Sequence, residues 1–113
     1  MSDNAYLLHI RDAILKIELY ITAGREIFMA DSLRQDAVIR QLEIIGEATK
    51  KLSLELRLKY PTIPWRRIAG LRDVLIHEYM GVDLNAIWEL TQQNIPELKI
   101  ALESMLADHS NQD

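Results

Sequence analysis

Apolar residues recur every three or four positions along most of the chain, which is the period of an α-helix with one buried face. The first such stretch predicts a helix from about Asn4 to Ala23. Its apolar stripe is Leu7, Ile10, Ile14, Ile17 and Ile21. Asp3 or Asn4 is expected to cap this helix, because a short polar side chain can accept from the free amides of the first turn. Gly24 ends or bends it.

A second long helix is predicted to begin near Asp31 or Ser32 and to reach about Leu52, after a short helical turn over residues 25–30. Within that turn Phe28 and Met29 are expected to point inward. The inner stripe of the long helix is Val38, Leu42, Ile45, Ala48 and Leu52. Gly46 interrupts the pattern at a cost of about 1 kcal/mol relative to alanine. We therefore expect another helix or a ligand to approach the backbone there.

The second half of the chain predicts further helices separated by short breaks. Residues 54–60 are predicted to form a short helix. The prolines at 61 and 64 end it, and Pro64 is well placed in the first turn of the next helix. That next helix runs from about Trp65 to Met80, with Gly81 after it. Asp83 caps the last helical segment, in which Pro96 either makes a kink or begins a new helix capped by Asn94. The inward residues of these helices are Ile68, Leu71, Leu75, Ile76, Ile87, Trp88, Leu90, Leu98, Leu102 and Met105.

These elements predict an all-α fold, an antiparallel bundle of four to five helices joined by short connections. With 113 residues the chain is expected to be a single domain spanning 1–113, with a polar, frayed tail from about Asp108. Three prolines, four glycines and no alternating strand pattern agree with this fold class. Trp65 and Trp88 are expected in the core or an interface more often than stacked on bases.

Composition restricts the compartment and the chemistry. The absence of cysteine excludes a disulfide framework and a thiolate metal site, and it fits a reducing, cytoplasmic location. The first twenty residues contain charges throughout, so we expect neither a signal peptide nor a membrane span. The histidines at 9, 77 and 109 lack metal-binding spacing, and no glycine-rich phosphate loop is found. We expect no metal and no cofactor.

The net charge of −4 conceals an uneven distribution. Residues 50–72 contain seven basic side chains and one acidic one, a net of +6, so the remainder carries −10. A positive surface on an acidic body can steer a polyanion to one place. Charge alone favours the plainer interpretation, in which these are solvated helix faces and loop charges.

One helix carries the candidate chemistry: Arg72, Asp73, His77 and Tyr79 fall within eight residues. Asp73 and His77 are four apart and therefore neighbours on a helix, so the carboxylate can fix which imidazole nitrogen is protonated. Arg72 and His77 lie about 140° apart around the axis, at about 100° per residue. A site shared by two subunits would remove that difficulty.

An arginine and a histidine together suit metal-free RNA cleavage by the 2′-hydroxyl. The imidazole can take or return a proton near neutral pH, and the guanidinium can hold the charged phosphate oxygens. By spacing alone, however, ordinary surface ion pairs are the commoner use of Arg72, Asp73 and His77, and a packing role is commoner for Tyr79.

The segment from Arg72 to Tyr79 follows the pattern arginine, four residues, histidine, any residue, tyrosine. It resembles the signature of the HepT family, the RNase toxins of the HEPN superfamily. Other matching segments occur in family order over roughly residues 5–105: Gly46-Glu47-Ala48, the run from Tyr60 to Trp65, the run from His77 to Asp83, and Trp88.

The resemblance implies a dimeric helical bundle in which the motif helices of two subunits line one cleft, with Arg72 and His77 as the catalytic pair and Asp73 in support. It also implies a type VII-like toxin–antitoxin system. The partner would be a minimal nucleotidyltransferase antitoxin that transfers AMP from ATP to Tyr79. The resulting phosphate would repel substrate phosphate and could capture Arg72.

Three alternatives remain open at this stage. Glu47 could reach the cleft, although a solvated or ion-paired role is favoured for it. The whole chain could instead be a non-catalytic partner module that binds and regulates a nucleotidyltransferase or a nucleotide. It could also be a structural bundle that uses its apolar stripes for oligomerisation.

Overall fold

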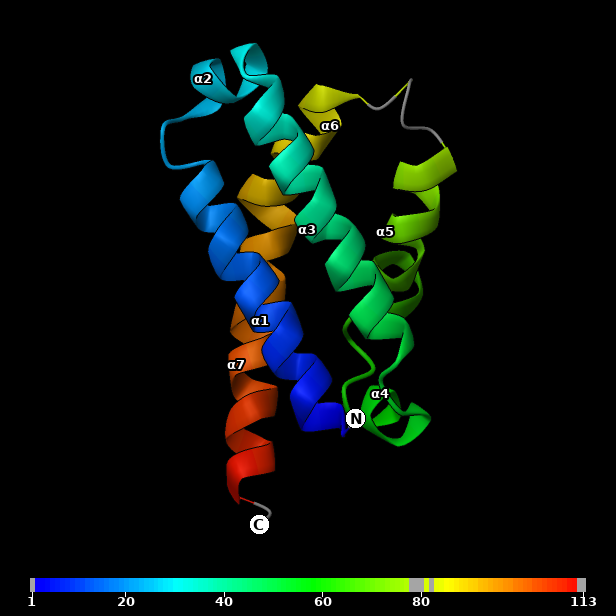
Figure 1. The fold of residues 1–113 in the computed structure, drawn as a ribbon. Helices are drawn as coiled ribbons and strands as arrows, with labels where there is room; N and C mark the ends of the chain where they lie inside the picture. The colour runs from blue at the N-terminus through cyan, green and yellow to red at the C-terminus, as the bar shows by residue number, and fades with distance from the viewer. Residues whose placement is uncertain (1, 78–80, 82, 112–113) are drawn as a thin grey trace.

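The computed structural model describes the backbone of residues 2–77, 81 and 83–111, and the side chains of these residues except 72–77 and 109–111. This part of the chain forms helices and short connections without strands, so the predicted all-α class is confirmed (Figure 1). The elements are α1 (Asp3–Tyr20), α2 (Arg25–Ala30), α3 (Ser32–Lys50), α4 (Leu54–Lys59), α5 (Trp65–His77), α6 (Leu84–Glu89), a π-helical segment (Leu90–Asn94) and α7 (Ile95–Asn111).

The long helices α1, α3, α5 and α7 form the bundle, and the short ones close its ends. Helix α3 packs against α1 on one side and against α5 on the other, and α7 packs against α1 (Figure 1). The ion pair between Lys99 Nζ and Glu18 Oε2, at 3.0 Å, joins the exposed edges of α7 and α1. Because α5 contacts the bundle mainly through α3, α3 sets the position of α5.

The predicted apolar stripes form the core. Nineteen-residue α3 and eighteen-residue α1 face each other through side chains that are fully or almost fully buried. Ile21 is half-buried and lies just beyond α1. Phe28 is fully buried and its ring centroid lies 5.4 Å from that of Trp88. The buried stripe residues of α1, α3 and α7 are Leu7, Ile10, Ile14, Ile17, Val38, Leu42, Ile45, Ala48, Leu98, Leu102 and Met105.

The cap of α1 differs from the prediction. Ser2 is the N-cap and its Oγ accepts from the Ala5 amide at 3.3 Å, so the expectation of Asp3 or Asn4 in this role is wrong. The Asp3 carboxylate instead accepts from Ser53, from its amide at 2.8 Å and from its hydroxyl at 2.5 Å. Ser53 caps α4 in turn. Asp3 is thus used to join two helix starts that are 50 residues apart.

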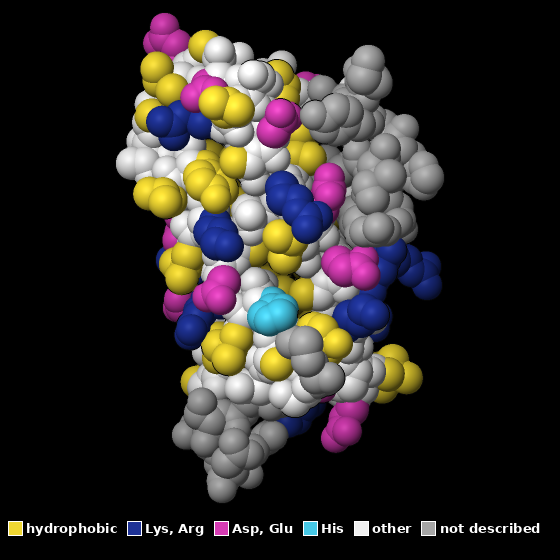
Figure 2. Space-filling view, viewed as in Figure 1, with side chains coloured by type: hydrophobic (Ala, Val, Ile, Leu, Met, Phe, Trp, Pro, Cys, Tyr) yellow, Lys and Arg dark blue, Asp and Glu magenta, His cyan; other side chains and the backbone are white. Residues whose placement is uncertain are grey.

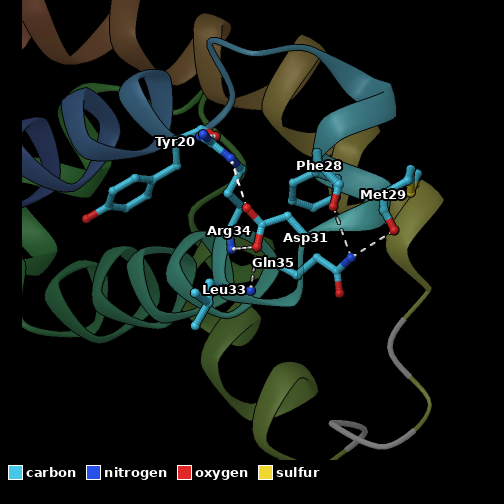
Figure 3. Close-up of polar contacts among 7 residues, drawn as sticks. All are labelled: Tyr20, Phe28, Met29, Asp31, Leu33, Arg34 and Gln35. Atoms are coloured by element: carbon cyan, nitrogen blue, oxygen red, sulfur yellow. Dashed lines mark hydrogen bonds and ion pairs between the residues drawn. The ribbon is translucent and has the colours of Figure 1, made fainter.

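The corner between α2 and α3 is held by side chains that bond to backbone (Figure 3). Helix α3 begins at Ser32, where its start was predicted, and Asp31 caps it by accepting from the amides of Leu33 and Arg34. The Arg34 guanidinium donates to the carbonyl of Tyr20 at 3.0 Å, and Gln35 Nε2 donates to the carbonyls of Phe28 and Met29. These bonds add donors to carbonyls at the ends of α1 and α2, where helical partners run out. The Phe28 carbonyl also accepts from the Asp31 amide.

Pro96 lies at the second position of α7, directly after the π-helical segment. Proline has no N–H, and its ring clashes with the carbonyl four residues earlier, so a regular turn is unfavourable there. The Ile95 amide bonds to the Leu90 carbonyl, five residues back. The backbone thus accommodates Pro96 with a wider turn. A new α-helix begins at Ile95, which is one of the two predicted alternatives, and the cap at Asn94 stays a prediction.

Helix α7 continues through Asn111, past the point from which a polar tail is expected. The Tyr60 hydroxyl donates to the Asp108 carboxylate and so fastens this last part of the helix to the segment after α4. This hydrogen bond, then burial and the charge of Asp108, raise the pKa of Tyr60 to about 12 from 10.0.

Candidate active-site helix

Helix α5 is positioned from its first residue. The Trp65 side chain is buried, and its indole Nε1 donates to the carbonyl of Arg57 at 3.1 Å and to that of Tyr60 at 3.0 Å. Both acceptors lie at the end of α4, where the carbonyls of Arg57 and Tyr60 also accept from the backbone amides of Tyr60 and Ile63. Pro64 directly precedes the helix, and its carbonyl accepts from the Ile68 amide at 3.1 Å. The start of α5 is therefore joined to the end of α4 by the Trp65 side chain.

The body of α5 lies along α3 (Figure 1). Ile68 and Leu71 are half-buried, which agrees with their predicted inward positions. Gly46 is buried within α3. The close approach expected at its backbone stays a prediction. The side chains of Leu75 and Ile76 lie outside the described residues.

The structure places Arg72, Asp73 and His77 on the last part of α5, whose backbone is helical through His77. Asp73 and His77 are therefore one turn apart on a regular helix, which is the geometry that lets a carboxylate contact an imidazole. Their side chains and that of Arg72 lie outside the described part, and Tyr79 lies outside it altogether. The grouping of these four side chains stays a prediction.

Glu47 lies on the exposed side of α3. It lines a surface groove between α1 and α3, together with His9 and Lys51. His9 was singled out in the sequence only as a histidine without metal-binding spacing. The structure shows it exposed, edge-on to the ring of Tyr6 at 6.4 Å between centroids. The sequence contains only a weak indication of this groove, namely that Tyr6 and His9 are three residues apart and so lie on one face of a helix.

The basic segment 50–72 divides into structural and exposed charges. The Arg57 guanidinium donates to the carbonyls of Leu52 and Lys50 and thereby caps the end of α3. Arg66 and Arg67 are exposed on the first turn of α5. Part of the predicted positive surface therefore remains available, on the helix that carries the motif.

A second groove of about 290 Å³ lies between the start of α5 and α7. Its walls are mainly apolar, from Ile68 and Leu71 on one side and Ile95 and Leu98 on the other, with Arg67 among the lining residues.

Within the described residues, no three His, Asp or Glu side chains converge as a metal site. No helix there has the length and apolarity to cross a bilayer.

Comparison with known proteins identifies the family of this chain. The family model "Ribonuclease HepT-like" matches residues 10–105. A protein of Thermococcus cleftensis named probable ribonuclease HepT is 44% identical over 108 residues, which cover 92% of this chain and 96% of that protein. A Methanocaldococcus jannaschii protein, named as a gamma-glutamylcyclotransferase and candidate RNase, is 50% identical over 95 residues. Those residues cover 83% of this chain but 43% of that longer protein. No solved structure matches.

The helical bundle and the family match define the class as an all-α protein of the HEPN type. The family match covers most of the chain, so the chain belongs to the ribonuclease HepT-like family and its enzyme class is ribonuclease. The resemblance seen in the motif and its flanking segments is thereby confirmed at the level of the family.

Proposed function

We propose that this chain is an RNA endonuclease toxin that needs no metal, with Arg72 and His77 as its catalytic residues. The observation that carries the proposal is the continuous helix α5, which is regular through both residues and fixed along α3 in a chain of the ribonuclease family. A rigid helix is a suitable support for catalytic groups, because their spacing is then set by the backbone.

In the proposed reaction the ribose 2′-oxygen attacks the adjacent phosphorus. The new 2′-O–P bond forms as the P–O5′ bond breaks, leaving a 2′,3′-cyclic phosphate and a 5′-hydroxyl. An imidazole takes the proton of the 2′-hydroxyl, and a protonated imidazole gives one to the leaving O5′. The Arg72 guanidinium donates to the non-bridging oxygens as negative charge grows on them.

Two imidazoles acting in one turnover would come from His77 of two copies of the chain. A regular helix separates Arg72 and His77 by about 140° around its axis, at about 100° per residue. A two-fold cleft allows the arginine of one copy to meet the histidine of the other. We propose a homodimer on this ground, alone or within a larger complex with the antitoxin. Asp73, one turn before His77, holds the imidazole in the required tautomer.

Glu47 is the proposed acidic residue of the cleft. It lies on α3, the helix that contacts α5, and it is exposed to solvent. A carboxylate there can orient Arg72 or contact the antitoxin.

Control of the enzyme is proposed to act through Tyr79 and a minimal nucleotidyltransferase antitoxin. The phenol oxygen attacks the α-phosphorus of ATP, pyrophosphate leaves, and the phenolic proton is released. The attached AMP adds negative charge two residues from His77, which repels substrate phosphate. Mass spectrometry after incubation with the proposed nucleotidyltransferase antitoxin and ATP should show one AMP on wild type and none on Tyr79→Phe. AMP on another residue instead would contradict this control.

The catalytic proposal is tested by RNA cleavage with unmodified protein in a chelator. Wild type should cleave and leave cyclic phosphate ends, and His77→Ala should lose at least about 100-fold in rate, in the range that general acid–base catalysis supplies. His109→Ala, a histidine on a different helix, is the matched control and should keep its activity. Equal cleavage by wild type and His77→Ala would overturn the proposal and favour a non-catalytic partner module. Loss of wild-type cleavage on chelation would overturn metal independence.

A further inference from the structure

A surface groove of about 330 Å³ runs between α1 and α3, on the face shown in Figure 2. Basic and acidic side chains and a histidine gather there. The lining residues used below are Tyr6, His9, Arg40, Glu43, Glu47 and Lys51. No part of the proposed cleavage mechanism requires this groove, apart from Glu47.

The groove exists because α1 and α3 pack through their inner stripes and leave the outer edges apart. Ala48, buried on the wall of α3, fills little of the space between the helices. Ile44 is half-buried beside it and gives the groove an apolar patch. A flat ring could pack on this patch and on the ring of Tyr6.

Cationic groups lie at both ends of the groove's α3 wall. Arg40 has 69% of its side chain exposed, and its contact with Glu43, at 3.5 Å in the open, is worth little. Lys51 is exposed directly after the end of α3. Eleven residues separate the two, about 16 Å along a helix at 1.5 Å per residue. That distance is long enough for several nucleotides of a single strand.

Carboxylates between the two cations make the groove unsuitable for a bare polyanion. Glu43 and Glu47 would repel phosphate, but they can accept from an amino group on the edge of a base. His9 and Tyr6 add two rings at the α1 wall. The ligand class that carries an anion, a flat ring and amino donors together is a nucleotide.

We propose that the α1/α3 groove binds single-stranded RNA away from the cleaved phosphate, with Arg40 and Lys51 at backbone phosphates and a base that carries an exocyclic amino group against Tyr6 and His9. This inference rests on the proposed function. Helix α3 contacts both α1 and α5, so a strand leaving the motif helix crosses α3 to reach the groove. Glu47, the proposed cleft residue, lines that groove.

The test measures binding, not cleavage, with labelled ten-nucleotide adenosine, cytidine and uridine homopolymers. His77→Ala serves as background so that the RNA stays intact. Adding Lys51→Glu or Arg40→Glu should weaken binding of the adenosine oligomer at least about fivefold and flatten its salt dependence. Lys16→Glu, an exposed lysine of α1 that does not line the groove, is the control for net charge. Equal weakening by Lys16→Glu would overturn the groove as the binding site.

Two further comparisons address the base. His9→Ala should weaken binding about fivefold, within the range for loss of one stacking ring, and His9→Phe should restore it. Adenosine and cytidine oligomers should bind more tightly than uridine, which has no exocyclic amino group. Equal affinity for all three, or no effect of His9→Ala, would overturn the proposed base contact.

The two proposals fail separately. Equal cleavage by wild type and His77→Ala would overturn the catalytic assignment, while the binding data would still show whether the groove holds RNA. Normal His77-dependent cleavage with unaltered binding by Lys51→Glu and Arg40→Glu would overturn the groove alone.

Discussion

The indole N–H of Trp65 donates to the carbonyl of Tyr60 at 3.0 Å, across the junction between α4 and α5. A second acceptor, the carbonyl of Arg57, lies 3.1 Å from the same nitrogen. The first residue of the motif helix is thus fixed to the end of the preceding helix.

Trp65→Phe should therefore reduce both stability and ribonuclease activity. The two carbonyls keep their backbone donors, the amides of Tyr60 and Ile63, so the loss is that of the indole hydrogen bond, about 0.5–1.5 kcal/mol. Trp88→Phe is the matched control, because its indole is equally buried, at 9% exposure, but lies on α6. Urea unfolding and cleavage assays should show a stability loss in both variants. A loss of activity per folded molecule is expected in Trp65→Phe alone. Unchanged activity in that variant would show that the α4–α5 junction does not position the proposed site.

Tyr60 gives the fold a pH dependence in the alkaline range. Its folded-state pKa of about 12 lies above the ordinary 10.0, so the hydrogen bond to Asp108 stabilises the fold fully below pH 10. That contribution is lost as the pH rises through the raised pKa. Asp108 is exposed and Tyr60 is half-buried, so only about 0.2–1 kcal/mol is expected for the pair.

Tyr60→Phe should accordingly lower stability slightly at pH 8, and the difference from wild type should disappear between pH 10 and 12. Ultraviolet titration should show one tyrosine that ionises at higher pH than the others in wild type, and this step should be missing from the curve of Tyr60→Phe. Identical titration curves, apart from the lost chromophore, would contradict the hydrogen bond.

Phe28 attaches α2 to α6 through its contact with Trp88. Phe28→Ala should cost about 3–5 kcal/mol, since the ring is fully buried and its removal leaves a cavity. Ile27→Ala changes the neighbouring side chain, which is 46% exposed, and should alter stability by less than about 0.5 kcal/mol. Thermal or urea unfolding of both variants checks this, and similar losses would show that α2 is held by something other than Phe28.

Arg72→Lys tests whether the proposed site needs a guanidinium or only a positive charge. Lysine cannot bind two phosphate oxygens as a planar fork, so kcat/KM should fall at least about tenfold with the fold intact. Arg66→Lys, at an exposed arginine of the same helix, should change kcat/KM by less than about twofold. Full activity in Arg72→Lys would reduce the role of Arg72 to general electrostatic attraction.

The sequence predicted the parts of this protein that depend on local pattern. Apolar spacing located the long helices and nearly all of the core, from Leu7 in α1 to Met105 in α7, because a helix buries whichever side chains repeat at its own period. Asp83 was correctly predicted as a cap, since a cap bonds to amides only two or three residues away, and the start of α3 near Asp31 was also correctly predicted. The ordered motif identified the ribonuclease family.

Only the tertiary structure decided what depends on residues far apart in the chain. Asp3 bonds to Ser53 and leaves the cap of α1 to Ser2, a choice that local preference does not distinguish. Likewise, the α1/α3 groove forms only because packing brings Tyr6 of α1 and Lys51 at the end of α3 to line one groove. Helical periodicity states which face of a helix is buried, but the partner of that face is set by packing of the whole bundle.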